Sequence, residues 1–131
     1  MTEEQKHCLY KRMDNGIHEL ILINPPHAAI DEMVEQVKTV LETTPVEAPL
    51  TRYLIDCSRA GSMPLIHLRR RIKELEQFRP EGREPGRVAI VYDGLLERFA
   101  IILLTRAVSN RLGFFKPSER EAALQWLLES E

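Results

Sequence analysis

The segment Thr51–Leu68, TRYLIDCSRAGSMPLIHL, constrains the fold more than any other part of the chain. It begins with a short apolar, β-prone run at 53–55, which predicts a buried strand. Residues typical of a turn follow at Asp56, Ser58 and Gly61. Ser62 is expected to be the N-cap of a helix that has Pro64 in its first turn. Strands that lead directly into helices build parallel α/β sheets, whose functional groups lie at the carboxyl edge.

The N-terminal part of the chain predicts a β-hairpin followed by a helix. Two β-prone runs, Cys8–Met13 and Ile17–Ile23, flank Asp14-Asn15-Gly16, and Asn-Gly between such runs is a strong hairpin signal. Continuous apolar residues at the end of the second run indicate a central strand. Asn24 is expected to cap the next helix with Pro25 as its first residue, and the break follows at Thr43-Thr44-Pro45.

The remaining elements alternate between helix and strand. The helix that starts after Ser62 is predicted to be amphipathic, with an apolar stripe from Leu65 to Phe78. The patterns then predict a buried strand Arg87–Tyr92, a helix Leu95–Leu112 stopped by Gly113, a brief edge strand at Phe114-Phe115, and a last helix capped by Ser118–Glu121. The predicted order is β-β-α-β-α-β-α-(β)-α. The expected fold is α/β, with a mostly parallel sheet of four to five strands and about four helices in a single domain over residues 1–131.

Composition narrows the class of protein. The 131 residues suit one domain, and the formal net charge of -2 does not predict a nucleic-acid partner. The polar N-terminus lacks the pattern of a secretory signal, and the longest apolar run, 99–104, is too short for a transmembrane segment. Cys8 and Cys57 are too few for a disulfide framework, and we expect a reducing cytoplasm.

Three local patterns carry a resemblance to a known family. They are Leu54-Ile55-Asp56-Cys57-Ser58 before a turn and helix, Arg87-Val88-Ala89-Ile90-Val91 as the next strand, and the ending from Phe114-Phe115 through Glu121-Ala122-Ala123-Leu124-Gln125-Trp126-Leu127. Together with the element order, they resemble the STAS-like domains related to bacterial anti-sigma factor antagonists such as SpoIIAA, and in particular its uncharacterised SpoIIAA-like branch. The resemblance implies a domain that works through contacts with other proteins.

The resemblance also implies a regulatory site. In the regulatory members, a Ser at the start of the helix after the central strand is phosphorylated by a partner kinase. Aligned without a gap, Ser62 falls on that position, although Gly61, Met63 and Pro64 differ from the family motif. A phosphate at a helix N-terminus is stabilised by free N–H groups and the macrodipole. The alternative is that Ser62 is only an N-cap.

No residue pattern indicates catalysis, a cofactor or a metal site. Asp56 and Asp93 follow predicted strands, but no acidic pair accompanies them to hold a hard cation, so both are interpreted as turn residues. Cys57 is expected to be a buried core residue. The four histidines, His7, His18, His27 and His67, lack metal-ligand spacing. The basic cluster at 69–73 is interpreted as a solvated helix face because acidic residues are interleaved around it.

The predicted helix 95–112 has two apolar stripes rather than one. The second consists of Ile101, Leu104, Val108 and Leu112. A helix that is apolar nearly all round is buried against something, either neighbouring elements of the same chain or a second copy in a two-fold dimer.

These observations favour a non-enzymatic cytoplasmic protein-interaction module that forms a homodimer, with a regulatory protein as a further partner. One alternative is the binding of a lipid or another small apolar ligand, because the STAS-like fold resembles the lipid-binding SEC14 domain in element order. Another is a phosphorylation-switched regulator with Ser62 as acceptor.

Overall fold

A five-stranded sheet in the order β1-β2-β3-β4-β5 forms the centre of the protein. The computed structural model describes residues 6–44, 51–78, 86–94 and 112–129. The strands are β1 (Cys8–Arg12), β2 (His18–Ile23), β3 (Tyr53–Arg59), β4 (Val88–Val91) and β5 (Leu112–Phe115). β1 is antiparallel to β2, and all other neighbours are parallel. The predicted mostly parallel α/β sheet with one antiparallel pair is therefore confirmed.

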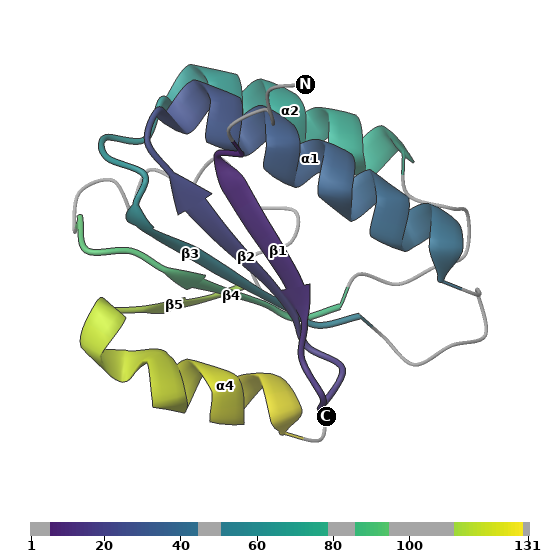
Figure 1. Ribbon diagram of the computed structural model, residues 1–131, viewed down its shortest axis with the longest axis vertical. Helices are drawn as coiled ribbons and strands as arrows, with labels where there is room; N and C mark the ends of the chain where they lie inside the picture. Colours follow the sequence, from purple (N-terminus) through teal and green to yellow (C-terminus); the bar gives the residue numbers. More distant parts are fainter. Residues whose placement is uncertain (1–5, 45–50, 79–85, 95–111, 130–131) are drawn as a thin grey trace, which may run out of the picture.

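Helices cover both faces of this sheet. α1 (Pro26–Thr43) and α2 (Leu65–Phe78) lie side by side on one face, and α4 (Arg120–Leu128) packs on the other (Figure 1). The described residues contain these three α-helices, whereas about four were expected; the helix predicted over 95–112 lies outside the described residues apart from Leu112. Within the described ranges, no helix combines the length and apolar character needed to cross a membrane.

The predicted hairpin is confirmed, and its loop explains the Asn-Gly signal. The Met13 N–H donates to the Ile17 carbonyl at 2.8 Å, and the Gly16 N–H donates to the Met13 carbonyl at 2.9 Å. Gly16 has a φ of 88°, a left-handed conformation that glycine adopts without a steric penalty. The Asn15 side chain accepts the Ile17 N–H at 3.1 Å, so local hydrogen bonds close the turn.

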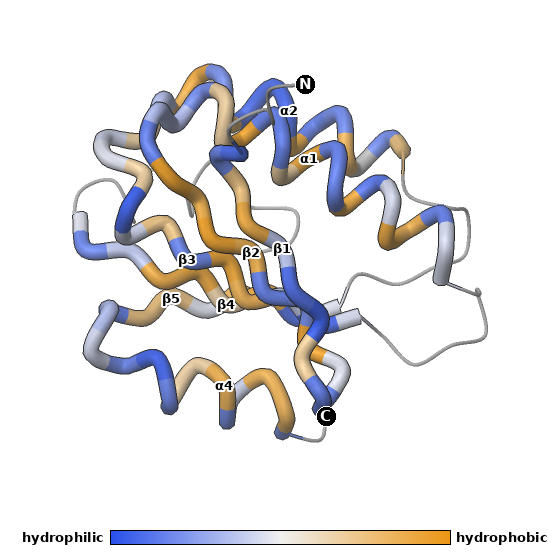
Figure 2. Tube along the Cα trace, viewed as in Figure 1, coloured by the Kyte–Doolittle hydropathy of each residue, from blue (hydrophilic) through white to orange (hydrophobic). Residues whose placement is uncertain are grey.

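The core consists of two clusters separated by the sheet. Side chains alternate along β3, so Tyr53 and Cys57 face α1 and α2 while Leu54 faces α4. On the first face they pack with Leu20, Ile30 and Val34 among others, and on the second with Ile17, Ala89, Val91, Ala123 and Leu127. Figure 2 shows β2 hydrophobic over most of its length, whereas β1 becomes hydrophilic toward the hairpin. Burial on both faces explains the continuous apolar run of β2.

Trp126 holds α4 against the last two strands. Its ring lies 5.8 Å from that of Phe115, and the Arg87 guanidinium stacks 5.0 Å from its centroid while donating to the Trp126 carbonyl at 2.5 Å. A Cβ at Gly113 would lie 3.1 Å from the indole ring. Gly113 therefore leaves room for Trp126 inside β5. The prediction that Gly113 ends a helix, with Leu112 as the last helical residue, is wrong because both residues pair with β4.

Both helices on the first face begin later than predicted. Pro25, not Asn24, is the N-cap of α1, with φ −82° and ψ 143°. A residue that precedes proline avoids the helical region, so Pro25 stays extended and the helix starts at Pro26. In α2 the carbonyl of Pro64 accepts the Leu68 N–H at 2.9 Å, which places Pro64 at the N-cap position. The prediction of Ser62 as N-cap is therefore wrong.

Two further boundaries differ from the prediction. β3 continues to Arg59, so Asp56 lies within the strand, where its Oδ1 accepts the Ser58 N–H at 2.9 Å and the Ser58 hydroxyl at 2.6 Å. Ser118 does not cap the last helix. A 3₁₀ turn (Pro117–Glu119) precedes α4, and the Glu119 carboxylate accepts the Lys116 N–H at 2.7 Å. This interaction caps the 3₁₀ turn, whereas α4 starts at Arg120 with Glu119 as its N-cap and without a side-chain capping hydrogen bond.

Truncation of the central strand tests the two-sided core. Leu54 is 0% exposed, so Leu54→Ala should lower the free energy of unfolding by about 2–5 kcal/mol, through lost burial and the cavity left behind. Leu9 is 42% exposed on β1, and Leu9→Ala is the control, with an expected loss below about 1 kcal/mol. Urea unfolding followed by circular dichroism measures both values. Equal losses would contradict the assignment of Leu54 to the core.

Candidate functional site

A cleft of about 700 Å³ lies where the first turns of α1 and α2 meet the loop after β3. α1 follows β2 and α2 follows β3, so the cleft is at the carboxyl edge of the parallel strands, the expected location of functional groups in such folds. Its walls are formed by His27, Met63, Pro64, Leu65, Ile66, His67 and Arg70. The apolar side chains come from the start of α2, and the polar ones come from both helices.

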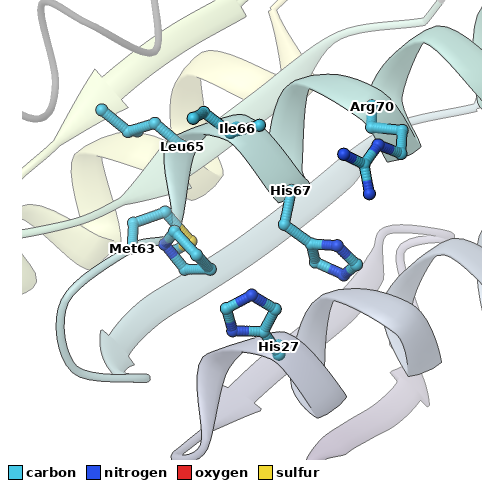
Figure 3. Close-up of a pocket in the computed structure, with 7 residues that line it drawn as sticks. His27, Met63, Leu65, Ile66, His67 and Arg70 are labelled. Atoms are coloured by element: carbon cyan, nitrogen blue, oxygen red, sulfur yellow. The ribbon is translucent and has the colours of Figure 1, made fainter.

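Two imidazoles face each other in this cleft. The ring centroids of His27 and His67 are 4.7 Å apart with an interplanar angle of 33° (Figure 3). His27 is exposed, whereas the His67 side chain is only 19% exposed. The spacing of the histidines in the sequence does not indicate this pair, because the two residues belong to different helices. Each histidine lies two or three residues after the N-cap of a helix that follows a strand, and that shared position was the available signal.

Asp31 and Arg71 join the two helices behind the histidine pair. Nε2 of His67 lies 2.8 Å from Oδ1 of Asp31, which also lies 3.4 Å from Nε of Arg71. The same guanidinium donates to Glu35 at 3.0 Å and to Glu74 at 2.8 Å. Arg71 is therefore a tie between α1 and α2 and not part of a solvated face, whereas Arg69 and Arg70 are exposed as predicted.

Of the predicted site residues that the structure describes, Ser62 lies next to the cleft and Leu112 lies in the sheet. Ser62 is exposed in the loop before α2, directly beside Met63 of the cleft wall, and its role as phosphate acceptor stays a prediction. Ile101, Leu104 and Val108 lie outside the described residues. Leu112 is half-buried in β5, where it pairs with Val88.

Among the described residues, the histidine pair is not part of a larger group of metal-ligating side chains. Within residues 6–44, 51–78, 86–94 and 112–129, no group of three or more His, Cys, Asp or Glu side chains is arranged to hold a metal ion. The cleft is lined by hydrogen-bonding and apolar side chains.

The two cysteines are core residues of the sheet. Cys8 and Cys57 are 7% and 5% exposed, and burial raises the pKa of each thiol to about 12. Negative charge from Glu32 at Cys8 and from Asp56 at Cys57 adds to the effect. Both thiols are therefore protonated near neutral pH and lack the thiolate that a nucleophile needs. The interpretation of Cys57 as a buried core residue agrees with this position.

Thiol labelling tests this assignment. In the folded protein at about pH 8, iodoacetamide should modify Cys8 and Cys57 at least ~100-fold more slowly than it modifies a free thiol, because reaction requires the exposed thiolate. In denaturant both should react at the rate of the free thiol. Mass spectrometry after timed quenching measures the rates, and rapid labelling of either cysteine in the folded protein would contradict its burial.

His18 is the buried centre of an aromatic cluster at the opposite end of the strands, between the buried Tyr53 and the exposed Tyr10. It is 7% exposed and lies between the rings of Tyr10 and Tyr53, with centroids 5.9 Å and 5.5 Å away. Nδ1 of His18 is 2.7 Å from the Tyr10 hydroxyl. Burial lowers the pKa of His18, and the nearby Arg12 lowers it further. Burial therefore favours the neutral imidazole in the folded protein, and an Nδ1 that carries no proton accepts from the Tyr10 hydroxyl.

This cluster should make stability depend on pH. The unfolded chain binds a proton at His18 near pH 6.5, whereas the folded chain binds it only at lower pH, so the stabilisation present above about pH 6.5 declines as the pH falls. Urea unfolding between about pH 8 and 5 should show a smaller decline for His18→Gln than for the wild type. Identical slopes would show that His18 is not responsible.

The sheet order and the placement of the helices define the class of fold, and comparison with solved structures identifies it as SpoIIAA-like. The chain is similar to the crystal structure of an uncharacterised protein from the DUF3478 family with a SpoIIAA-like fold, from Shewanella loihica PV-4. The similarity covers 97% of this chain and 98% of that chain, with a TM-score of 0.63 and 20% identity. No protein-family model matches the chain, and no curated protein does. The resemblance inferred from the sequence is thus confirmed for the fold.

Proposed function

We propose that the chain is a non-enzymatic protein-interaction module that forms a homodimer, and that the first turn of α2 belongs to its contact surface. The observation that carries this proposal is the exposure of Ile66, which at 79% is far above that of Leu128 at 48% or Leu9 at 42%. Burying such a side chain is worth about 1.5–3 kcal/mol, so its exposure favours a contact that covers it. Leu65 and Pro64, both half-buried, extend the same apolar surface.

The position of this surface supports the proposal. It lies at the carboxyl edge of the parallel strands, on a helix that Arg71 holds against α1. A rigid helix end presents its side chains with little loss of conformational entropy on binding. The second apolar stripe of the predicted helix 95–112 offers a different dimer surface, through Ile101, Leu104, Val108 and Leu112, and that interface stays a prediction.

A second candidate function is a switch at Ser62, and its exposure in the loop directly before Met63 and Pro64 favours it. A phosphate there would add a charge of about −1.5 to −2 next to the apolar surface. That charge would have to be desolvated on contact, so it would weaken the dimer. The lipid-binding alternative depended on helix 95–112 as a cavity wall, which lies outside the described residues, and it also stays a prediction.

Native mass spectrometry and sedimentation velocity test the homodimer. The wild type should sediment as a dimer at micromolar concentration, and Ile66→Asp should raise its dissociation constant at least ~10-fold, because each two-fold interface loses the side chain twice. Leu128→Asp is the matched control, since it also places a charge at an exposed aliphatic side chain, but on α4. It should remain dimeric.

The outcomes separate the two candidate surfaces. If Leu104→Asp with Val108→Asp gives a folded monomer while Ile66→Asp stays dimeric, the dimer uses the helix 95–112 stripe and the α2 surface is wrong. A wild type that remains monomeric at about 100 μM, a concentration at which a stable homodimer forms, would contradict the homodimer altogether.

A further inference from the structure

The cleft between α1 and α2 has two chemically different walls. One wall is apolar and consists of Met63, Pro64, Leu65 and Ile66, and the other carries the polar side chains of His27, His67 and Arg70. We propose that the cleft binds a small organic anion in which a carboxylate or a phosphate group is joined to an apolar group. The cleft shares Pro64, Leu65 and Ile66 with the proposed contact surface of the homodimer, so a ligand and a second copy would compete for these side chains.

On the polar wall, Arg70 and His27 pair with no acidic side chain among the described residues, whereas Nε2 of His67 is bound to Asp31. The described residues contain no acidic partner of Arg70, because Asp31, Glu35 and Glu74 pair with its neighbour Arg71. A guanidinium presents a fork of N–H groups that suits carboxylate and phosphate oxygens. Arg70 therefore has the free charge that an anionic ligand requires.

The two imidazoles are positioned to add further hydrogen bonds. The Nε2–H of His67 donates to Asp31 at 2.8 Å, which orients the ring; Nδ1 has no partner among the described residues and donates to an anion when the ring is protonated. His27 has no hydrogen-bond partner within those residues either, and its ring faces that of His67 (Figure 3). Arg70 lies one helical turn beyond Ile66 and extends toward the same side of α2 as the His67 ring.

The starts of both helices reinforce this preference for an anion. Pro25 and Pro64 occupy the N-cap positions, and proline has no side-chain oxygen with which to cap the first N–H groups. Neither α1 nor α2 has an acidic residue in its first turn. The N-cap residue of each helix therefore supplies no side-chain acceptor for the first backbone N–H groups, and the helix dipole adds positive potential at these ends.

The apolar wall indicates that the ligand also contains an apolar group. Ile66 and Leu65 lie beside the polar groups, so an inorganic ion alone would leave them uncovered. The volume of about 700 Å³ lies within the range of small-molecule sites, which is about 300–1,000 Å³. An aromatic or short aliphatic anion would contact both walls at once.

Proton NMR of the histidine Cε1–H signals tests this site directly. The probes are phenyl phosphate, benzoate, inorganic phosphate and neutral benzyl alcohol, titrated at constant pH and ionic strength. Phenyl phosphate or benzoate should shift the signals of His27 and His67 saturably and leave those of His7 and His18 unchanged. Inorganic phosphate and benzyl alcohol, which each lack one half of the ligand, should bind at least ~10-fold more weakly. The tighter of the two organic anions identifies the preferred anionic group.

Two arginine variants on the same helix complete the test. Arg70→Gln should weaken the tighter probe at least ~10-fold, because a charged hydrogen bond contributes about 1.5–3 kcal/mol. Arg69→Gln removes an equal charge from an exposed neighbour outside the cleft and should leave binding unchanged. Benzyl alcohol binding as well as the anions, equal effects of the two variants, or no saturable shift up to about 10 mM would each overturn the proposal. Sedimentation of the unliganded wild type is measured separately, so the homodimer and the anion site can fail independently of each other.

Discussion

The parallel pairing of β3 on both sides is the interaction on which the rest of the structure depends. β3 pairs with β2 along one edge and with β4 along the other, in registers that place Tyr53 beside both His18 and Val88. Side chains on both faces of the strand are consequently buried, and the core divides into two clusters. The same pairing directs the end of β3 toward the end of β2. The two helices that follow these strands therefore start next to each other, and the cleft forms between them.

The contact between α1 and α2 turns this neighbourhood into a defined site. Arg71 reaches across to Asp31 and Glu35 while also pairing with Glu74. Each ion pair at a partly exposed position contributes little stability. Their main consequence is geometric, because Asp31 also orients His67 and because Arg71 takes the acidic groups that would otherwise neutralise Arg70. Arg71, which the sequence pattern places on a solvated helix face, thus determines the electrostatics of the cleft.

The sequence predicted the strands and helices well where a local signal dominates. The hairpin at Asn15-Gly16 and the helix over 26–43 follow from turn chemistry and apolar spacing alone. The errors fall at helix starts and at Gly113. Ser62 and Asn24 are residue types that are favoured at N-caps. Both helices nevertheless start later, because a residue that precedes proline avoids the helical conformation. Gly113 looked like a helix stop because the packing of Trp126, which explains it, is a contact between distant residues.

The sequence by itself determined the α/β class, the hairpin and the two-sided burial of the central strands, because each depends on residues close together in the chain. The SpoIIAA-like resemblance also rested on such apolar patterns. Only the tertiary structure brought His27 and His67 together and placed Ile66 in solvent at the mouth of the cleft. It also gave Arg71 acidic partners on α1, whereas Arg70 lines the cleft. Side chains from different helices meet only after the sheet has aligned those helices, so no local pattern contains that information.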